Sequence, residues 1–168
     1  MKNTIIFLSL FISSFFIMSC GDNDTEKSID QNIIEVITGD PNDDPFYYNF
    51  LNQKEDSTNW QLSYFAQSAG QGYFMPSIDL DKKILLYVEN DMSFDEIKSV
   101  PASVFFKPGA GKLSNGGEFE VLSYDMTIHK IGVSDKSFII FDTTSERAFK
   151  LRFEDYSNWV LTFQYLEL

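Results

Sequence analysis

Short runs of alternating apolar and polar residues recur along most of the chain and predict a succession of β-strands. Residues 60–64, 149–153 and 159–165 alternate most regularly, as strands with one buried face do. Residues 138–141 are apolar without a break, so we expect that strand to be covered on both faces. The remaining strand candidates are residues 33–37, 46–51, 78–80, 84–88, 103–107, 119–124 and 127–133.

Turn-forming residues lie between these runs. Asp81-Lys82-Lys83 separates two strand candidates and suits a hairpin, and Ser114-Asn115-Gly116-Gly117 is a second hairpin signal. Because short strands and turns dominate, the sequence predicts an all-β fold. We expect an antiparallel two-sheet β-sandwich or barrel-like domain with at most one short helix.

That helix is predicted over residues 93–100. Ser93 can cap its first turn, and Glu96, three residues later, completes a capping box. Pro101 then ends it, because proline cannot continue a helix.

The N-terminus has the pattern of a secretory signal peptide. Lys2 supplies a positive charge, and the apolar run that follows is shorter than the roughly 20 residues needed to span a bilayer. Ser19 and Gly21 place small residues on either side of Cys20, which resembles the lipobox of bacterial lipoproteins. We therefore expect a signal peptide over residues 1–19 and lipidation of Cys20. The other interpretation is an ordinary signal peptide with an incidental cysteine.

A polar tether and one domain follow the signal peptide. Residues 20–32 are predicted to be a flexible acidic tether, and residues 33–168 have the length of a single β domain. The acidic residues just after Cys20 resemble the surface-export signal of Bacteroidota-type lipoproteins. This resemblance implies lipid anchoring in the outer membrane, with the domain exposed at the cell surface. A polar tether of the kind common to all lipoproteins is the alternative.

Charge and composition narrow the possible partners. The formal net charge is −12, which argues against binding nucleic acid or anionic lipid through electrostatics. The sequence holds 17 Phe, 8 Tyr and 2 Trp, and aromatic residues suit half-buried strands. Cys20 is the only cysteine, so no internal disulfide can form and the apolar core must supply the stability. Trp60 and Trp159 are the expected anchors of that core.

No catalytic motif is complete. Residues 109–112 read Gly-Ala-Gly-Lys, but Leu113 stands where a phosphate-binding loop needs Ser or Thr. Residues 40–44 place Asp and Asn at alternate positions, but Pro45 occupies the glycine position of a calcium loop and no glutamate closes it. The sequence has one histidine, and we expect the protein not to be an enzyme.

Several segments, read in order over residues 46–168, resemble the HmuY-like family of haem-binding outer-membrane lipoproteins. Residues 59–65 (Asn-Trp-Gln-Leu-Ser-Tyr-Phe) are similar to an early strand of that family, and residues 69–72 to its glycine-rich segment. Residues 93–101 and 123–129 are similar to two further motifs, the second of which ends in histidine. The closing strands, from residue 138 to residue 165, match best.

The resemblance implies a two-sheet β protein that binds haem iron through side chains. Family members use two histidines, whereas this chain offers only His129. The second ligand would then be a methionine (Met75, Met92 or Met126), a tyrosine or no residue. Imidazole and thioether both suit haem iron. If residues 124–131 form one regular strand, Met126 and His129 face opposite sides of it. Met75, expected in a loop, is then the freer partner.

The leading hypothesis is a surface lipoprotein that binds haem or a related porphyrin for an outer-membrane uptake system. The alternative is an interaction module that lost haem ligation and docks on an envelope protein or a glycan. The aromatic excess and the missing second histidine favour this alternative.

Overall fold

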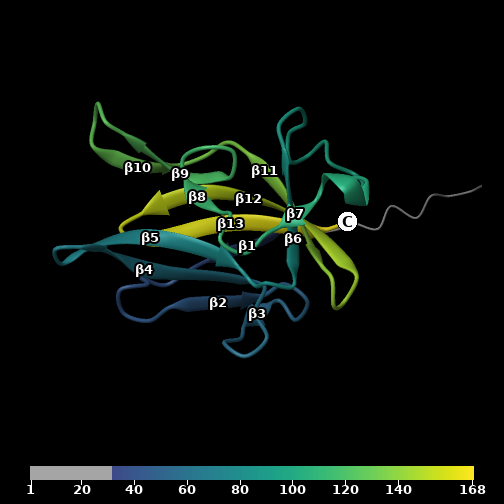
Figure 1. Cartoon of the computed structure of the whole chain (residues 1–168), viewed down its shortest axis with the longest axis horizontal. Coiled ribbons are helices and arrows are strands. Elements are labelled where there is room, and N and C mark those ends of the chain that lie inside the picture. The colour runs from purple at the N-terminus through teal and green to yellow at the C-terminus, as the bar shows by residue number, and fades with distance from the viewer. Residues whose placement is uncertain (1–31) are drawn as a thin grey trace, which may run out of the picture. The chain divides into compact units, whose positions relative to one another are not determined.

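The computed structural model describes residues 32–168, and nearly all of its regular structure is β-strand (Figure 1). The prediction of an all-β fold is confirmed. A single 3₁₀ turn, η1 (Ser103–Phe105), accompanies the strands. The strands are β1 (Ile34–Ile37), β2 (Phe46–Asn49), β3 (Lys54–Glu55), β4 (Leu62–Gly70), β5 (Tyr73–Leu80), β6 (Ile84–Glu89), β7 (Lys107–Pro108), β8 (Ser114–Asn115), β9 (Glu120–Asp125), β10 (Lys130–Val133), β11 (Ser137–Asp142), β12 (Arg147–Ser157) and β13 (Val160–Glu167).

Two large sheets face each other and form the sandwich. One has the order β1-β13-β12-β11-β6-β7 and the other β3-β2-β4-β5. Their shared core is aromatic: the Phe50 ring lies 4.7 Å from that of Tyr165 and 5.6 Å from that of Phe149. A small third sheet, β10-β9-β8, contributes the buried Val121 and Leu122 to the same core, an addition to the two sheets expected.

The alternation of apolar residues correctly predicts the C-terminal strands. Leu161, Phe163 and Tyr165 of β13 are buried in the core. Phe138 and Ile139 of β11 are both fully buried, which confirms that this strand is covered on both faces. Both tryptophans, in contrast, are half-buried and lie outside the core, so their expected role as core anchors is wrong.

Neither predicted hairpin turn joins a hairpin. The turn at Asp81-Lys82-Lys83 passes the chain from β5, an edge strand of one large sheet, to β6 in the other. The turn at Gly116 and Gly117 does form, with φ of 100° and 86°, but β8 and β9 on either side of it run parallel. Local turn signals therefore predict where the chain bends and not which strands pair.

The helix predicted over residues 93–100 is a single turn. Half of its capping box is present, since the Ser93 backbone N–H donates to the Glu96 carboxylate at 2.9 Å. The turn stops because Lys150 Nζ donates to the carbonyls of Phe94 and Ile97, at 2.8 and 3.0 Å. These carbonyls would otherwise accept the next helical hydrogen bonds, and Pro101 has no N–H to give. Lys150 is 3% exposed, and burial lowers its pKa.

The predicted signal peptide, Cys20 and nearly all of the tether lie outside the described residues. Within residues 32–168 we find no helix long and apolar enough to cross a membrane.

Gly109 permits a close crossing of β6 by the segment after β7. A Cβ atom added there would lie 2.9 Å from the Ile84 carbonyl oxygen and 2.9 Å from Leu80 Cδ1. We expect Gly109→Ala to lower the free energy of unfolding by about 1–3 kcal/mol, the usual cost of overpacking. Gly39→Ala is the matched control, because no atom lies within 4 Å of its Cβ position. Urea unfolding of both variants tests this, and equal midpoints would contradict it.

Candidate functional site

A groove of about 520 Å³ opens between the β9–β10 hairpin and the turn that joins β12 to β13. This volume falls within the range of about 300–1,000 Å³ found for small-molecule sites. We call it the His129 groove, and it is lined by Tyr124, His129, Lys130, Ile131, Tyr156, Ser157, Asn158 and Trp159.

The groove exists because β12 extends beyond the end of its neighbour β11. The pairing of β12 with β11 stops at Arg152, and the outer half of β12 continues to Ser157 beside β13 alone. β10 lies next to this outer half without joining its ladder, so the two strands diverge and leave a slot. A β-bulge at Glu154, between Phe153 and Asp155, shifts the register there. As a result Tyr156, not Asp155, lies opposite the buried Leu161.

His129 occupies the loop of the β9–β10 hairpin, so the strand predicted over residues 127–133 begins only at Lys130, and the condition that residues 124–131 form one regular strand is not met. Asp125 pairs with Lys130 across the hairpin, and residues 126–129 form the loop. His129 has φ of 53°, a left-handed conformation that lets the loop close. Its side chain is exposed, and Nδ1 lies 2.9 Å from the Tyr124 hydroxyl. This contact orients the ring and leaves Nε2 available.

Trp159 forms the opposite wall from a two-residue turn. Asn158 and Trp159 connect Ser157 to Val160 with φ of 50° and 67°, the left-handed pair of a type I′ turn. Glycine is the usual second residue of such a turn, and tryptophan is strained there. The Tyr64 hydroxyl donates to the Trp159 carbonyl at 2.9 Å and ties the turn to β4. Burial raises the pKa of Tyr64, which keeps its hydroxyl protonated as a donor.

Backbone strain is concentrated at this groove. In the described part of the chain six non-glycine residues have left-handed φ, and three of them, His129, Asn158 and Trp159, line it. Strained residues persist when rigid surroundings hold them, and they cluster at functional sites. Here two strand pairs hold them, which favours a binding role for the groove.

The few metal-binding side chains of the groove suit a metal ion that is already bound in an organic ring. Across residues 32–168 no group of three His, Cys, Asp or Glu side chains is placed to hold a metal ion. His129 provides one imidazole nitrogen beside two tyrosines and a tryptophan. A metal bound in a flat organic macrocycle needs only one or two protein ligands and gains from aromatic contacts. Lys130 is the one charged residue of the lining, and its ammonium can pair with a carboxylate.

The two candidate methionines do not converge with His129. Met126 lies in the same four-residue loop and is 75% exposed. Met75 lies in β5 and not in a loop, so that expectation is wrong. Alternation along β5 places Met75 on the same face as Ser77, whereas Ile78 points into the core. Met75 therefore projects on the opposite side of this sheet from the core and from Tyr64.

Sequence reasoning found His129 but missed the aromatic residues around it. Tyr156 follows a bulge that no local pattern reveals, and Trp159 was expected in the core. One signal was present: Asn158 begins a two-residue interval between two alternating runs, which is typical of a hairpin turn.

No family model matches the chain, and no curated protein matches it either. Its fold and groove define the class instead: an all-β antiparallel sandwich with an open aromatic groove that carries a single histidine.

Replacement of Trp159 tests whether the turn is strained. Trp159→Ala and Trp159→Gly remove the same indole, but only glycine relieves the left-handed backbone. We expect the glycine variant to be more stable than the alanine variant by about 1 kcal/mol. Urea unfolding of the two variants measures the difference. Equal stability, or a more stable alanine variant, would show that the turn carries no strain.

Proposed function

We propose that this protein is a surface-exposed lipoprotein that binds haem or a related porphyrin for uptake, in the manner of the HmuY-like family. The supporting observation is the position of His129, which presents a free imidazole nitrogen in a slot walled by aromatic side chains. Such a slot accepts a flat ring, and imidazole is a preferred ligand of haem iron.

Three residues have proposed roles around the ring. His129 binds the iron through Nε2, which requires the proton to sit on Nδ1. Tyr124 then accepts that N–H and fixes the tautomer, as partners of metal-bound histidines commonly do. Lys130 pairs with a propionate group. Bound haem would supply the iron and the absorbance that reports on these contacts.

We propose that neither Met75 nor Met126 joins His129 in holding the iron. Met126 is confined to the same short loop as His129, and Met75 projects from the far face of β5. His129 would therefore hold the iron without a thioether from either methionine.

The point at which the chain enters the domain fits outward presentation of the groove. Ile34, at the start of β1, pairs with Tyr165, whereas the turn at Asn158 and Trp159 lies at the other end of β13. A lipid on Cys20 would therefore connect to the domain at the end opposite the groove. This polarity suits a protein that collects a ligand from outside the cell.

A second function, docking on an envelope protein, is favoured by apolar side chains at two hairpin tips. Tyr73 and Phe74 of the β4–β5 hairpin are 71% and 52% exposed, and Met126 and Ile128 of the β9–β10 hairpin are 75% and 59% exposed. Exposed apolar patches often mark interaction surfaces. A pull-down of envelope proteins tests the docking function. Loss of the captured partner when haemin is added would show that the partner and haem bind at the same surface.

Titration of haemin into the full chain, purified in mild detergent, tests the haem proposal. We expect a saturable Soret band that His129→Ala abolishes. Tyr124→Phe should weaken binding roughly tenfold, the effect of losing a residue that orients a metal ligand. Met126→Ala should leave the band unchanged.

Tyr47→Phe is the control for loss of a tyrosine hydroxyl. Tyr47 lies in β2, packs on Trp60 and does not line the groove. A Soret region that stays flat, or a band that persists in His129→Ala, would rule out this site.

Anchoring through Cys20 can be tested separately. We expect Cys20→Ser to prevent incorporation of labelled fatty acid and to release the protein from the membrane fraction. Accessibility of the wild-type protein to protease on intact cells measures surface exposure. Labelling that survives the substitution would show that the lipid is attached elsewhere.

A further inference from the structure

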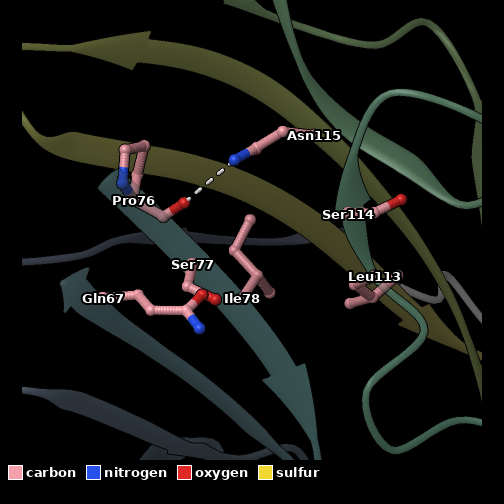
Figure 2. A pocket seen from close by; sticks show the side chains of 7 residues that line it. All are labelled: Gln67, Pro76, Ser77, Ile78, Leu113, Ser114 and Asn115. Carbon is pink, nitrogen blue, oxygen red and sulfur yellow. Dashed lines mark hydrogen bonds between the residues drawn. The ribbon is translucent and has the colours of Figure 1, made fainter. Parts of the chain in front are cut away.

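A second, smaller pocket of about 230 Å³ lies where the edge of one large sheet meets the edge of the small sheet (Figure 2). β5 forms one side, and the segment from Leu113 to Asn115, which includes β8, forms the other. The two edges touch at one point, where Asn115 Nδ2 donates to the Pro76 carbonyl at 3.4 Å. We call this space the β5–β8 pocket.

The floor of the pocket is apolar and firmly held. Pro76, Ile78 and Leu113 line it and are buried, with Ile78 5% and Leu113 8% exposed. The segment that carries Leu113 is fixed across β5 by a hydrogen bond from the Gly111 N–H to Asp79 Oδ1, at 2.6 Å. The pocket is therefore formed before any ligand arrives.

The rim consists of neutral hydrogen-bonding groups. It carries the amides of Gln67 and Asn115 and the hydroxyls of Ser77 and Ser114. Among the seven lining residues the only mutual hydrogen bond joins Asn115 to Pro76, so Gln67 and Ser77 keep donors and acceptors for a ligand. Figure 2 shows these two side chains together on one side of Ile78, with Leu113 on the other.

No charged side chain lines the β5–β8 pocket, although 23% of the chain is charged. The sequence between Asp56 and Asp79, which supplies β4 and most of β5, contains no charged residue at all. A neutral rim pairs poorly with ions, because charged groups lose hydration without gaining a counter-charge. The pocket therefore suits a neutral ligand with many hydroxyl groups and an apolar face.

We propose that the β5–β8 pocket binds one ring of a neutral oligosaccharide. Because β5 is an edge strand, the pocket takes Gln67 and Ser77 from the outer face of the sheet and Ile78 from its core face. The ring hydroxyls pair with Gln67, Ser77 and Asn115, and the C–H face of the ring lies against Leu113 and the edge of Ile78. The volume lies below the range of about 300–1,000 Å³ typical of larger ligands, which fits a single sugar ring. This site shares no lining residue with the His129 groove.

Tyr73 extends the proposed site along β5. It lies on the same face as Ser77 by strand alternation, four residues or about 14 Å away. Its side chain is 71% exposed, so its ring offers a platform for a further sugar of the same oligosaccharide. Longer oligomers should therefore bind more tightly than single sugars.

An array of glucans, mannans and N-acetylglucosamine oligomers, with sialylated and sulfated glycans beside them, tests the proposal on the full chain in detergent. We expect binding of at least one neutral series and of no charged series. Titration of the bound oligomer should then shift the side-chain amide resonances of Gln67 and Asn115. Gln67→Ala and Ser77→Ala should each weaken binding about fivefold, as loss of one neutral hydrogen bond does.

Ser68→Ala is the matched control, because Ser68 is also an exposed serine of the β4–β5 hairpin and does not line the pocket. It should bind like the wild type, as should His129→Ala, which separates this site from the haem proposal. Tyr73→Ala should weaken binding of oligomers but not of single sugars. An array without a neutral signal, equal binding of charged glycans, or full binding by Gln67→Ala and Ser77→Ala would overturn the proposal.

Discussion

Tyr48 lies where the two large sheets meet, and its packing holds the sandwich together. Its ring makes edge-to-face contacts with Phe163 at 5.6 Å and with Tyr165 at 5.8 Å. The two tyrosine hydroxyls are 3.2 Å apart, and burial raises the pKa of both, so they remain a neutral hydrogen-bonded pair. Because the only cysteine is Cys20, no disulfide can close this domain, and burial of such side chains must stabilise it.

The same packing positions the His129 groove. β12 and β13 are fixed in the core by Phe153, Phe163 and their neighbours, and the two strands extend past the end of β11 as a rigid pair. This support allows the turn to keep Trp159 in a left-handed conformation that glycine would adopt without cost. Packing in the core thus maintains a strained turn at the surface, where Trp159 lines the groove.

Apolar periodicity was sufficient to predict the fold class and most strands, because successive residues of a strand point alternately to the buried and the exposed face. Pairing was not predictable from local signals, as the turn at Asp81 shows by joining two sheets. The missing helix has the same cause: Lys150, more than fifty residues away in sequence, takes the carbonyls that a longer helix would need. Side chains distant in sequence decide these features.

The candidate site shows the same limit. His129 could be found because it is the only histidine, but its aromatic neighbours come from strands that diverge only in three dimensions. Met75 and Met126 were candidates by chemistry alone, and geometry separates them from His129. The only sequence signal of the β5–β8 pocket was the uncharged stretch before Asp79. That stretch forms one side of a pocket only because the fold places β8 next to β5.

The net charge of −12 constrains both proposed ligands in the same way. Long-range repulsion slows the approach of an anion such as haem, so its binding must depend on short-range contacts: iron coordination, aromatic stacking and Lys130. A neutral oligosaccharide experiences no such repulsion and needs only hydrogen bonds and an apolar floor. The acidic surface therefore disfavours the approach of anions in general, and Lys130 is the one charged residue of the His129 groove that would offset this repulsion for haem.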